Sequence, residues 1–574
     1  MGCKRNLKLL VTCLVLLAAG SLFRSRRTKI EKYLNYKKNV MMTGIFWQPE
    51  NVATFDNVIV PATTQEIKEA KKDQMTITEP NLEVKRILKA SVKPHTSPLR
   101  IVHLDLKGAA PKVSYFQQLF PLIASLGADG ILLEYEDMFP YEGDLEILRS
   151  RFAYSVKEIE EITTLASLYN LEVIPLVQVF GHLEFVLKHR RFFHLREVAD
   201  FPNSLNPVVP DSLKLVKEML TQVLNKHPKT RWLHIGADEV YGLGTSEDSK
   251  NWLKQNSGGL GALFLSHVTK VCHFLAELKP GIKLIFWEDM IRKVNASILK
   301  ESGIQSLASP MIWKYDSNMN LSHIGQLLSN YKQAGFHTVW FASSFKGSSG
   351  IDQRWTPLNH HLMNHLAWLK VMASMSGDPS LQLVGIALTG WQRYAHHTVL
   401  CELLPVAIPS LAICLQSLKY GSFNHTAESE VQSLLGCKVN LAANSCQGNG
   451  SFAGADVYYM IQKIHNELQK STEKVTEHIH VRGTFGRYQR KYNFANPMYI
   501  EYFKGTVTRV LEEWNSFLET FKLEMMAIYY PDTVDEWMEQ HINPHMDKLY
   551  SLAKDIDRII KFKGQPKTYD KLPD

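Results

Sequence analysis

The strongest constraint on the fold is an alternation of short apolar runs with amphipathic stretches, which begins near residue 100. Runs rich in Val, Ile and Leu are typical of buried parallel strands, and the longer stretches between them are typical of crossover helices. Eight runs predict a (β/α)8 (TIM) barrel. An open doubly wound sheet is the alternative, but its usual Gly-X-Gly-X-X-Gly turn is absent. The predicted strands are Ile101–Leu106, Gly130–Glu136, Glu172–Val179, Trp232–Gly236, Lys283–Trp287, Met311–Tyr315, His337–Ala342 and Leu383–Leu388.

The same pattern divides the chain into segments. Residues 98–420 are expected to form the barrel, and residues 421–454, rich in Ser, Asn and Gly, a loop and linker. Residues 455–574 have a helical pattern without a strand-like run, which predicts a C-terminal helical domain or a buttress on the barrel. The expected helices include Ser155–Tyr169, Asp211–Asn225, Leu260–Leu278, His360–Ala373 and Thr398–Leu418.

The N-terminus carries an apolar stretch, Leu9–Phe23, with Lys and Arg on both sides. It is short for a membrane-spanning helix, which needs about 20 residues, but flanking basic side chains can reach the interface. The basic residues after it favour an uncleaved signal-anchor (1–29) and a stem (30–97), with a lumenal or extracellular body. A cleaved signal peptide with a secreted body, and a nucleocytoplasmic body, are the alternatives.

Two further features bear on the compartment. Cys437 and Cys446 bracket a polar loop and either form a disulfide in a lumenal body or remain free buried thiols. Glycosylation tripeptides mildly support a secretory route, because such tripeptides also arise by chance. They begin at Asn295, Asn320, Asn424 and Asn449.

The net charge of +8 does not indicate a nucleic-acid partner. Residues 1–40 contain ten of the 65 basic residues but one of the 57 acidic residues, so the remainder of the chain is nearly neutral. A nucleic-acid-binding domain needs a basic patch on its folded surface. The positive charge is therefore assigned to the flanks of the apolar segment, where it suits a membrane partner.

Reactive side chains are expected where the strands end, because active sites of such barrels lie at the C-terminal ends of the strands. Acids, bases and aromatic rings follow all eight predicted strands. Flat rings that stack on sugar faces, with carboxylates that bind hydroxyl groups, predict a carbohydrate site. The candidates are Asp105, Lys107, His182, His234, Asp238, Glu239, Trp287, Asp289, Trp313, Tyr315, Trp391 and Tyr394.

The strongest single motif is His234-Ile-Gly-Ala-Asp238-Glu239. Two adjacent carboxylates at the end of an apolar strand are costly unless they are paired or functional. Neighbouring strand residues point to opposite faces, so both reach one cavity only where the backbone leaves the pleat. Mutual repulsion is expected to keep one of them protonated nearer neutral pH, as a general acid beside an ionised partner.

This motif resembles the His-X-Gly-X-Asp-Glu pattern of family 20 glycoside hydrolases, the β-N-acetylhexosaminidases. His-Leu-Asp-Leu-Lys-Gly-Ala at 103–109, Gly-His at 181–182, Trp-Glu-Asp-Met at 287–290 and Gly-Trp-Gln-Arg-Tyr at 390–394 are similar to the hexosaminidase D branch of that family. The resemblance covers about residues 98–420. It implies substrate-assisted retention, in which the 2-acetamido group of a terminal N-acetylhexosamine is the nucleophile. It implies no metal and no cofactor.

The resemblance also implies roles for the candidates. Glu239 is the general acid and later the base, and Asp238 orients the acetamido nitrogen and stabilises the oxazolinium intermediate. Trp287, Trp313 and Trp391 wall the sugar subsite, and either Tyr315 or Tyr394 binds the acetamido oxygen. Asp105, Lys107, His182, His234 and Asp289 are candidate contacts to the sugar. Many family members have Arg where Lys107 stands, so a preference for glucosamine or galactosamine stays open.

Two other interpretations are compatible with this sequence. A metal-dependent hydrolase on the same barrel would use His234, Asp238 and Glu239, helped by His182 and Glu184. His361 and His365 add a pair at helical spacing. A catalytically weak glycan-binding barrel is the second interpretation. The sequence predicts no oligomeric state.

Overall fold

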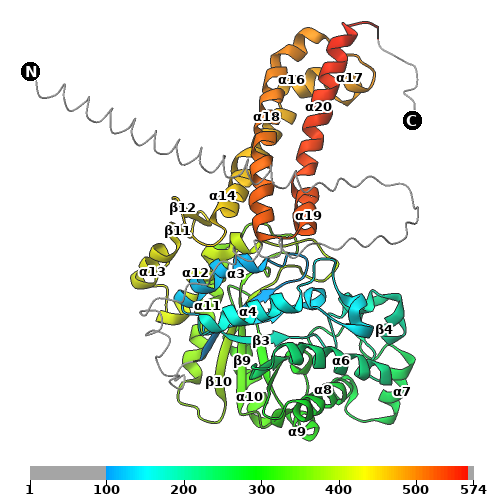
Figure 1. The fold of residues 1–574 in the computed structure, drawn as a ribbon, viewed down its shortest axis with the longest axis vertical. Helices are drawn as coiled ribbons and strands as arrows, with labels where there is room; N and C mark the ends of the chain where they lie inside the picture. The colour runs from blue at the N-terminus through cyan, green and yellow to red at the C-terminus, as the bar shows by residue number, and fades with distance from the viewer. Residues whose placement is uncertain (1–97, 567–574) are drawn as a thin grey trace, which may run out of the picture. The chain divides into compact units, whose positions relative to one another are not determined.

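The computed structural model describes residues 98–566, which belong to the compact unit Lys93–Asp574. These residues are coloured in Figure 1. The predicted anchor (1–29) and stem (30–97) lie outside the described residues.

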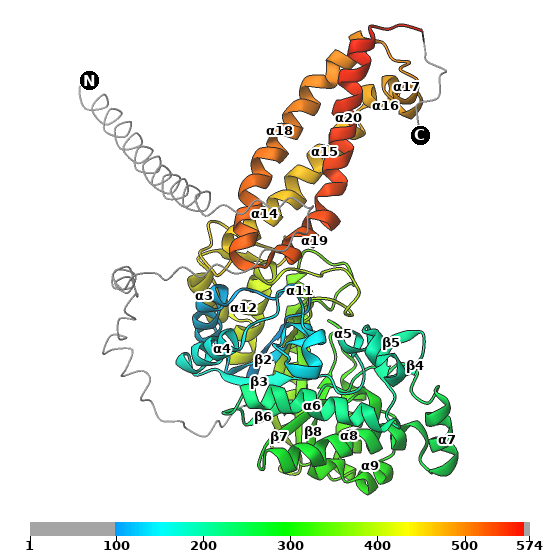
Figure 2. The same ribbon diagram turned by 45° about the vertical axis from the view of Figure 1, so that its right-hand side comes forward.

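Eight parallel strands close into a barrel in the order β1-β10-β9-β8-β7-β6-β3-β2 (Figures 1 and 2). Each overlaps one predicted strand, so the predicted (β/α)8 barrel is confirmed. The parallel register places the C-terminal residues of neighbouring strands side by side; Asp105 pairs with Glu134, for example. The strands are β1 (Leu99–Asp105), β2 (Gly130–Glu134), β3 (Glu172–Leu176), β6 (Trp232–His234), β7 (Lys283–Trp287), β8 (Ala308–Trp313), β9 (Thr338–Lys346) and β10 (Gln382–Gly390).

Helices follow the strands and cover the outside of the barrel. Helix α4 shows why they begin where they do: Ser155 caps the N-terminus in a reciprocal capping box with Glu158. The α-helices of this part are α3 (Val113–Ser125), α4 (Val156–Leu168), α5 (Glu184–Leu187), α6 (Pro210–Lys226), α7 (Glu247–Gln255), α8 (Gly259–Leu278), α9 (Ala296–Ser302), α10 (Leu321–Gln333), α11 (Leu358–Met375) and α12 (Leu404–Tyr420). Short 3-10 helices are η1 (Glu136–Met138), η2 (Gly143–Leu148), η3 (Arg190–Leu195), η4 (Asp289–Ile291) and η5 (Ile304–Ser306).

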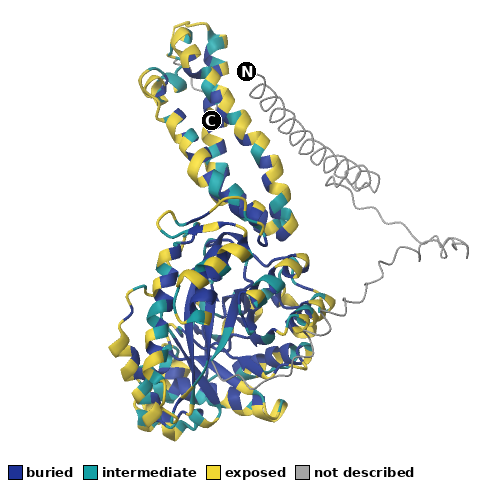
Figure 3. Ribbon diagram, turned by 90° about the vertical axis from the view of Figure 1, so that its left-hand side faces the viewer, coloured by how far each residue is buried: buried dark blue, intermediate teal, exposed yellow. Residues whose placement is uncertain are grey.

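The apolar core has two layers, and the strands between them are buried on both faces (Figure 3). The larger layer lies between strands and helices, and the smaller one fills the barrel interior. In the interior, Trp232 packs edge-to-face on Trp340 with ring centroids 5.1 Å apart. Because the strands are buried on both faces, their sequences are mostly apolar and do not alternate between apolar and polar residues.

A β-hairpin that the sequence did not predict lies between β3 and α6. It consists of β4 (Arg196–Val198) and β5 (Phe201–Leu205). Asn203 in β5 accepts a hydrogen bond from the backbone N–H of Leu183 and donates one to Glu184. The hairpin therefore holds the loop that carries His182.

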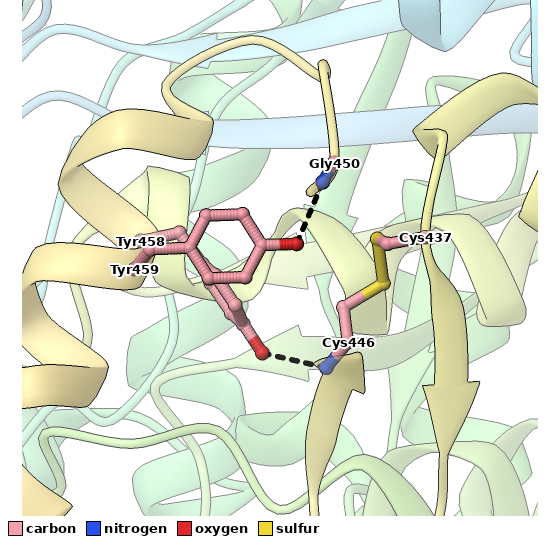
Figure 4. Close-up of a disulfide and its surroundings, with 5 residues drawn as sticks. All are labelled: Cys437, Cys446, Gly450, Tyr458 and Tyr459. Carbon is pink, nitrogen blue, oxygen red and sulfur yellow. Dashed lines mark hydrogen bonds between the residues drawn. A yellow bond between two sulfur atoms is a disulfide. The ribbon is translucent and has the colours of Figure 1, made fainter. Parts of the chain in front are cut away.

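The segment expected to be a loop and linker, 421–454, contains helix α13 (His425–Leu435) and a second hairpin, β11 (Lys438–Asn440) and β12 (Ser445–Gln447). A disulfide joins Cys437, which directly precedes β11, to Cys446 in β12 (Figure 4). The hydroxyl of Tyr458 accepts a hydrogen bond from the Cys446 N–H, and that of Tyr459 accepts one from Gly450. Of the two alternatives for this cysteine pair, the structure contains the disulfide.

The C-terminal part is helical from residue 455 to the end of the described chain. The long helices α18 and α20 lie side by side, as Figures 1 and 2 show. The elements are α14 (Ala455–Lys463), the π-helical turn η6 (Ile464–Leu468), α15 (Gln469–Thr476), α16 (Ile479–Thr484), α17 (Arg487–Lys491), α18 (Pro497–Ile528), α19 (Pro531–His541) and α20 (Asn543–Phe562).

Within residues 98–566, one helix, α8, has the length and hydropathy of a membrane span. It is a barrel helix that packs against α6, α7 and α9. Its apolar residues such as Phe264 and Val271 are buried in the core. A core helix of a barrel accounts for this composition.

Candidate active site

A cavity of about 410 Å³ opens at the C-terminal ends of the barrel strands. Nine of the twelve candidate residues line it, although they come from distant parts of the sequence. They are Lys107, His182, Asp238, Glu239, Trp287, Trp313, Tyr315, Trp391 and Tyr394. Asp105, His234 and Asp289 are not among its lining residues, and each contacts one of the residues that are.

The backbone after β6 leaves the strand in the way that two adjacent carboxylates require. Residues Gly236, Ala237 and Glu239 all have positive φ angles, of 61°, 72° and 46°. Such angles are uncommon for residues with a side chain and are held by the surroundings. Gln178 holds this turn, because its side chain accepts a hydrogen bond from the Ala237 N–H at 3.1 Å and donates one to Asp238 Oδ1 at 3.0 Å.

His182 links the two carboxylates. Its Nε2 atom lies 3.4 Å from Asp238 Oδ2 and 3.3 Å from Glu239 Oε2. Burial opposes the charged imidazole, but the two carboxylates outweigh burial and raise the pKa of His182 well above its usual value. The hydrogen bond from His182 in turn lowers the pKa of Glu239. The expectation that repulsion keeps one of the pair protonated is therefore wrong for Glu239, because the imidazolium compensates the negative charge.

Asp289, after β7, supports this turn from the other side. Its Oδ2 atom accepts the backbone N–H of Glu239 at 2.9 Å, and its Oδ1 atom accepts the indole N–H of Trp313 at 3.3 Å. Burial and the nearby charge of Asp238 raise the pKa of Asp289 to about 6. Asp289 thus fixes two residues of the cavity wall.

Aromatic rings form the other walls. Trp313 and Tyr315 stack with centroids 5.4 Å apart, and the rings of Trp287 and Trp391 lie 5.9 Å apart. The half-buried side chain of Tyr315 is hydrogen-bonded to Trp391 and Thr389. Tyr394, in contrast, is 56% exposed at the rim. The two candidate tyrosines therefore occupy different depths of the cavity.

His234 lies beneath the cavity. Its ring contacts Trp287 with centroids 4.4 Å apart, and its Nδ1 atom accepts the Gly236 N–H at 3.0 Å. Burial lowers the pKa of His234 to about 3, so the ring is neutral. His234 supports the tryptophan and the turn from below.

Lys107 is the buried cation at the end of β1. Its ammonium lies 3.0 Å from Asp105, 3.8 Å from Glu134 and 3.5 Å from Glu136. Burial alone would lower the pKa of Lys107, but these carboxylates raise it well above the usual value. Asp105 also accepts the backbone N–H of Gln392 at 2.6 Å, so it joins the ends of β1 and β10. Its own pKa is raised by burial.

Some lining residues were not candidates from the sequence: Glu134, Gln178, Gly347, Ser348, Gly350, Ile351 and Arg393. Glu134 and Arg393 stand at predicted strand ends, so the rule of strand ends could have included them. Gln178 follows β3 but resembles an ordinary polar loop residue. The stretch 347–351 carries no charge, and only the folded backbone brings it to the cavity.

The metal-dependent hydrolase considered from the sequence would need several ligand side chains grouped around one ion. Within residues 98–566, no group of three His, Cys, Asp or Glu side chains is placed to hold a metal ion. His361 and His365 are buried. His361 Nδ1 is hydrogen-bonded to the Ser344 carbonyl, His365 Nε2 to the Ser343 hydroxyl and His365 Nδ1 to the His361 carbonyl. Burial lowers the pKa of His365 to about 4.

Paired carboxylates and aromatic walls at the mouth of a closed (β/α)8 barrel indicate a glycosidase. Comparison with known families agrees: residues 135–344 match the catalytic domain of glycosyl hydrolase family 20. Hexosaminidase D of Homo sapiens is 43% identical over 463 residues, which cover 80% of this chain and 95% of the human protein. Hexosaminidase D of Bos taurus is 51% identical over 338 residues, covering 59% of this chain and 97% of the bovine protein.

Among solved structures, the β-N-acetylhexosaminidase from Bacteroides fragilis NCTC 9343 is 16% identical with a TM-score of 0.42, covering 55% of this chain and 65% of that chain. The chain belongs to glycosyl hydrolase family 20, in its hexosaminidase D branch. Its substrate is accordingly a glycan that ends in an N-acetylhexosamine.

Proposed function

We propose that this chain is a retaining exo-β-N-acetylhexosaminidase that removes terminal β-linked N-acetylglucosamine or N-acetylgalactosamine by substrate-assisted catalysis. One observation carries the proposal: Asp238 and Glu239 are consecutive residues that contact the same nitrogen of His182. An acid and a protein nucleophile must flank the scissile bond from opposite sides. Two carboxylates on one turn are instead suited to a mechanism in which the substrate supplies the nucleophile.

The proposed reaction has two steps. Glu239 gives its proton to the glycosidic oxygen while the acetamido carbonyl oxygen attacks C1, so that the leaving group departs as an alcohol. Asp238 accepts the acetamido N–H and stabilises the positive charge of the oxazolinium ring. Glu239 then removes a proton from a water molecule that attacks C1, which reopens the ring and returns the acetamido group. Two inversions at C1 leave the configuration retained.

His182 is assigned a positioning and charge-compensating role in this scheme. In the free site its hydrogen bond favours ionised Glu239. The Glu239 side chain is 28% exposed, so a bound sugar would remove water from it. Desolvation favours the protonated carboxyl, which is the form that donates the proton.

Each aromatic residue of the cavity is assigned either to the terminal sugar or to the leaving group. Trp287, Trp313 and Trp391 surround the terminal sugar, and Tyr315, half-buried beside Trp391, is the better placed of the two tyrosines for the acetamido oxygen. Tyr394 at the rim contacts the hydroxyl of Tyr241, which is hydrogen-bonded to Glu239. Tyr394 is therefore assigned to the leaving-group side.

Kinetics on a matched pair of aryl N-acetyl-β-hexosaminides, with glucosamine and galactosamine configurations, tests the proposed activity. The native chain should cleave at least one, and NMR of the first product should show the β-anomer. An α-anomer as first product, or turnover by Asp238→Asn at the native rate, would contradict the mechanism.

We also propose that the body lies in an oxidising compartment of the secretory pathway, held by a single N-terminal membrane span. The Cys437–Cys446 disulfide supports this, because disulfides persist in such compartments. The asparagines of all four glycosylation tripeptides are exposed. A gel shift after treatment of the expressed chain with an N-glycan-removing enzyme should disappear when all four asparagines are replaced by Gln. A chain without any shift would count against this compartment.

A further inference from the structure

The rim of the active-site cavity is tied to the C-terminal helices through one ion pair. Arg393, which lines the cavity after β10, binds both carboxylate oxygens of Glu536 in α19, with Nη1 and Oε1 2.6 Å apart. The side chains of Arg393 and Glu536 are 12% and 35% exposed. A bidentate pair of this kind fixes the plane of the guanidinium as well as its position.

A glycine three residues after β1 leaves room for this guanidinium. Gly108 has a positive φ angle of 76°, and a Cβ atom there would overlap Arg393. The Nε and Nη2 edge of the guanidinium therefore lies against a residue without a side chain. Thr533, three residues before Glu536, donates a hydrogen bond to the Gly108 carbonyl at 2.9 Å.

Further contacts anchor the start of α19 on the barrel. The backbone N–H of Lys112 donates to the Ile528 carbonyl at 2.7 Å, and its ammonium donates to the Met526 carbonyl at 2.6 Å. The Tyr529 hydroxyl accepts the Leu404 N–H at 3.2 Å. These bonds fix the turn between α18 and α19, and so they fix the place from which Glu536 reaches the cavity.

Arg393 and Glu239 stand on opposite sides of the cavity. Arg393 follows β10, which is next to β1, whereas Glu239 follows β6, three strands from β1 on one side and four from β10 on the other. If Glu239 acts on the bond at C1, the far side of the sugar ring, with the C4 hydroxyl, faces the ends of β10 and β1. Arg393 Nη1 donates to the Thr398 carbonyl as well as to Glu536, so the N–H groups left for such hydroxyl oxygens are that of Nε and one of Nη2.

We propose that Arg393 donates hydrogen bonds to the hydroxyl groups on the far side of the terminal sugar. Glu536 of α19 is then the residue that positions Arg393. The C-terminal helices thereby complete the part of the active site that distinguishes the two C4 epimers, N-acetylglucosamine and N-acetylgalactosamine. This inference rests on the proposed function, because it needs the sugar oriented by Glu239.

The test compares kcat/KM for aryl N-acetyl-β-glucosaminide and aryl N-acetyl-β-galactosaminide. In Arg393→Lys and in Glu536→Gln, the ratio of the two values should change by at least about fivefold, the worth of one net hydrogen bond. Asp535→Asn is the matched control: it removes the same charge from the neighbouring, exposed position of α19 and should leave the ratio unchanged. An unchanged ratio in both test variants would overturn the proposal.

A double variant in which the charges of residues 393 and 536 are exchanged distinguishes a role in sugar recognition from a role in folding. Arg393→Glu combined with Glu536→Arg keeps an ion pair between positions 393 and 536 but removes the guanidinium from position 393. The melting temperature of the exchanged chain should exceed that of Arg393→Glu alone, while its epimer ratio should stay altered. An exchanged chain that recovers both the melting temperature and the native ratio would refute recognition by Arg393.

Failure of the proposed function is distinguishable from failure of this inference. If Glu239→Gln retains native turnover, Glu239 is not the acid, and the proposed function and the sugar orientation based on it are both refuted. If Glu239→Gln is inactive and the epimer ratio is still insensitive to Arg393 and Glu536, the role of the C-terminal helices alone is refuted.

Discussion

Replacing Glu239 by Gln isolates the proton transfer from the geometry of the site. The position of residue 239 is set by its backbone, which Asp289 holds by a hydrogen bond of 2.9 Å, and an amide side chain of equal size preserves that contact. Gln cannot deliver a proton to the leaving oxygen. General acid catalysis contributes about 10²–10⁴-fold, so kcat/KM should fall by at least about 100-fold, or ~2.7 kcal/mol of transition-state stabilisation.

The dependence on the leaving group makes this prediction specific. A dinitrophenyl glycoside releases a stable anion and needs little protonation, whereas a methylumbelliferyl or alkyl glycoside needs more. The loss in the Glu239→Gln variant should therefore be smaller for the dinitrophenyl substrate than for the poorer leaving groups. Steady-state kinetics with such a series is the assay, and circular dichroism of the variant confirms its fold. An equal loss for every leaving group, or near-native rates, would refute the assignment of Glu239 as the acid.

Three further perturbations test neighbouring parts of the site and the fold. Asp238→Asn should reduce kcat at least about 100-fold, because it removes the charge that stabilises the oxazolinium ring; rates near the native value would contradict this. The raised pKa of His182 adds stability that is complete below about pH 6.5 and is lost as the pH rises through the folded value, so the melting-temperature gap between native and His182→Gln chains should narrow above pH 6.5. A constant gap would argue against a charged imidazole. Cys437→Ser should lower the unfolding free energy by roughly 2–3 kcal/mol in urea titrations under non-reducing conditions, and an unchanged midpoint would show that the disulfide contributes nothing.

The barrel was predictable because its strands are largely buried on both faces and are therefore mostly apolar in sequence. The hairpin β4–β5 escaped prediction because residues such as Pro202 and Asn203 suggest an irregular loop. The hairpin β11–β12 escaped for a similar reason: a disulfide and two tyrosine hydroxyls stabilise a Ser- and Asn-rich segment with little apolar surface.

The candidate site was predictable to the extent that its residues stand at strand ends. Lys107, Asp238 and Trp287 follow from that rule alone. Asp105 and Asp289 also stand there, but folding turns them toward neighbouring side chains and backbone, where they hold the cavity wall. Such a role depends on partners far away in the chain, and a single strand end does not reveal it.

Two features of the site could be found only in three dimensions. The lowered pKa of Glu239 depends on His182, which lies on the loop after β3, so no reasoning on the Asp-Glu pair by itself would have found it. The contact between Arg393 and Glu536 joins residues 143 positions apart. Nothing in the periodicity of α19 marks Glu536 as different from its exposed neighbour Asp535.

The most direct test of the central claim is the requirement for the acetamido group. An aryl N-acetyl-β-glucosaminide and an aryl β-glucoside with the same leaving group differ only at C2. Since a nucleophile within the substrate replaces one from the protein, the native chain should favour the acetamido substrate in kcat/KM by at least about a thousandfold. Comparable rates on the two substrates would contradict it.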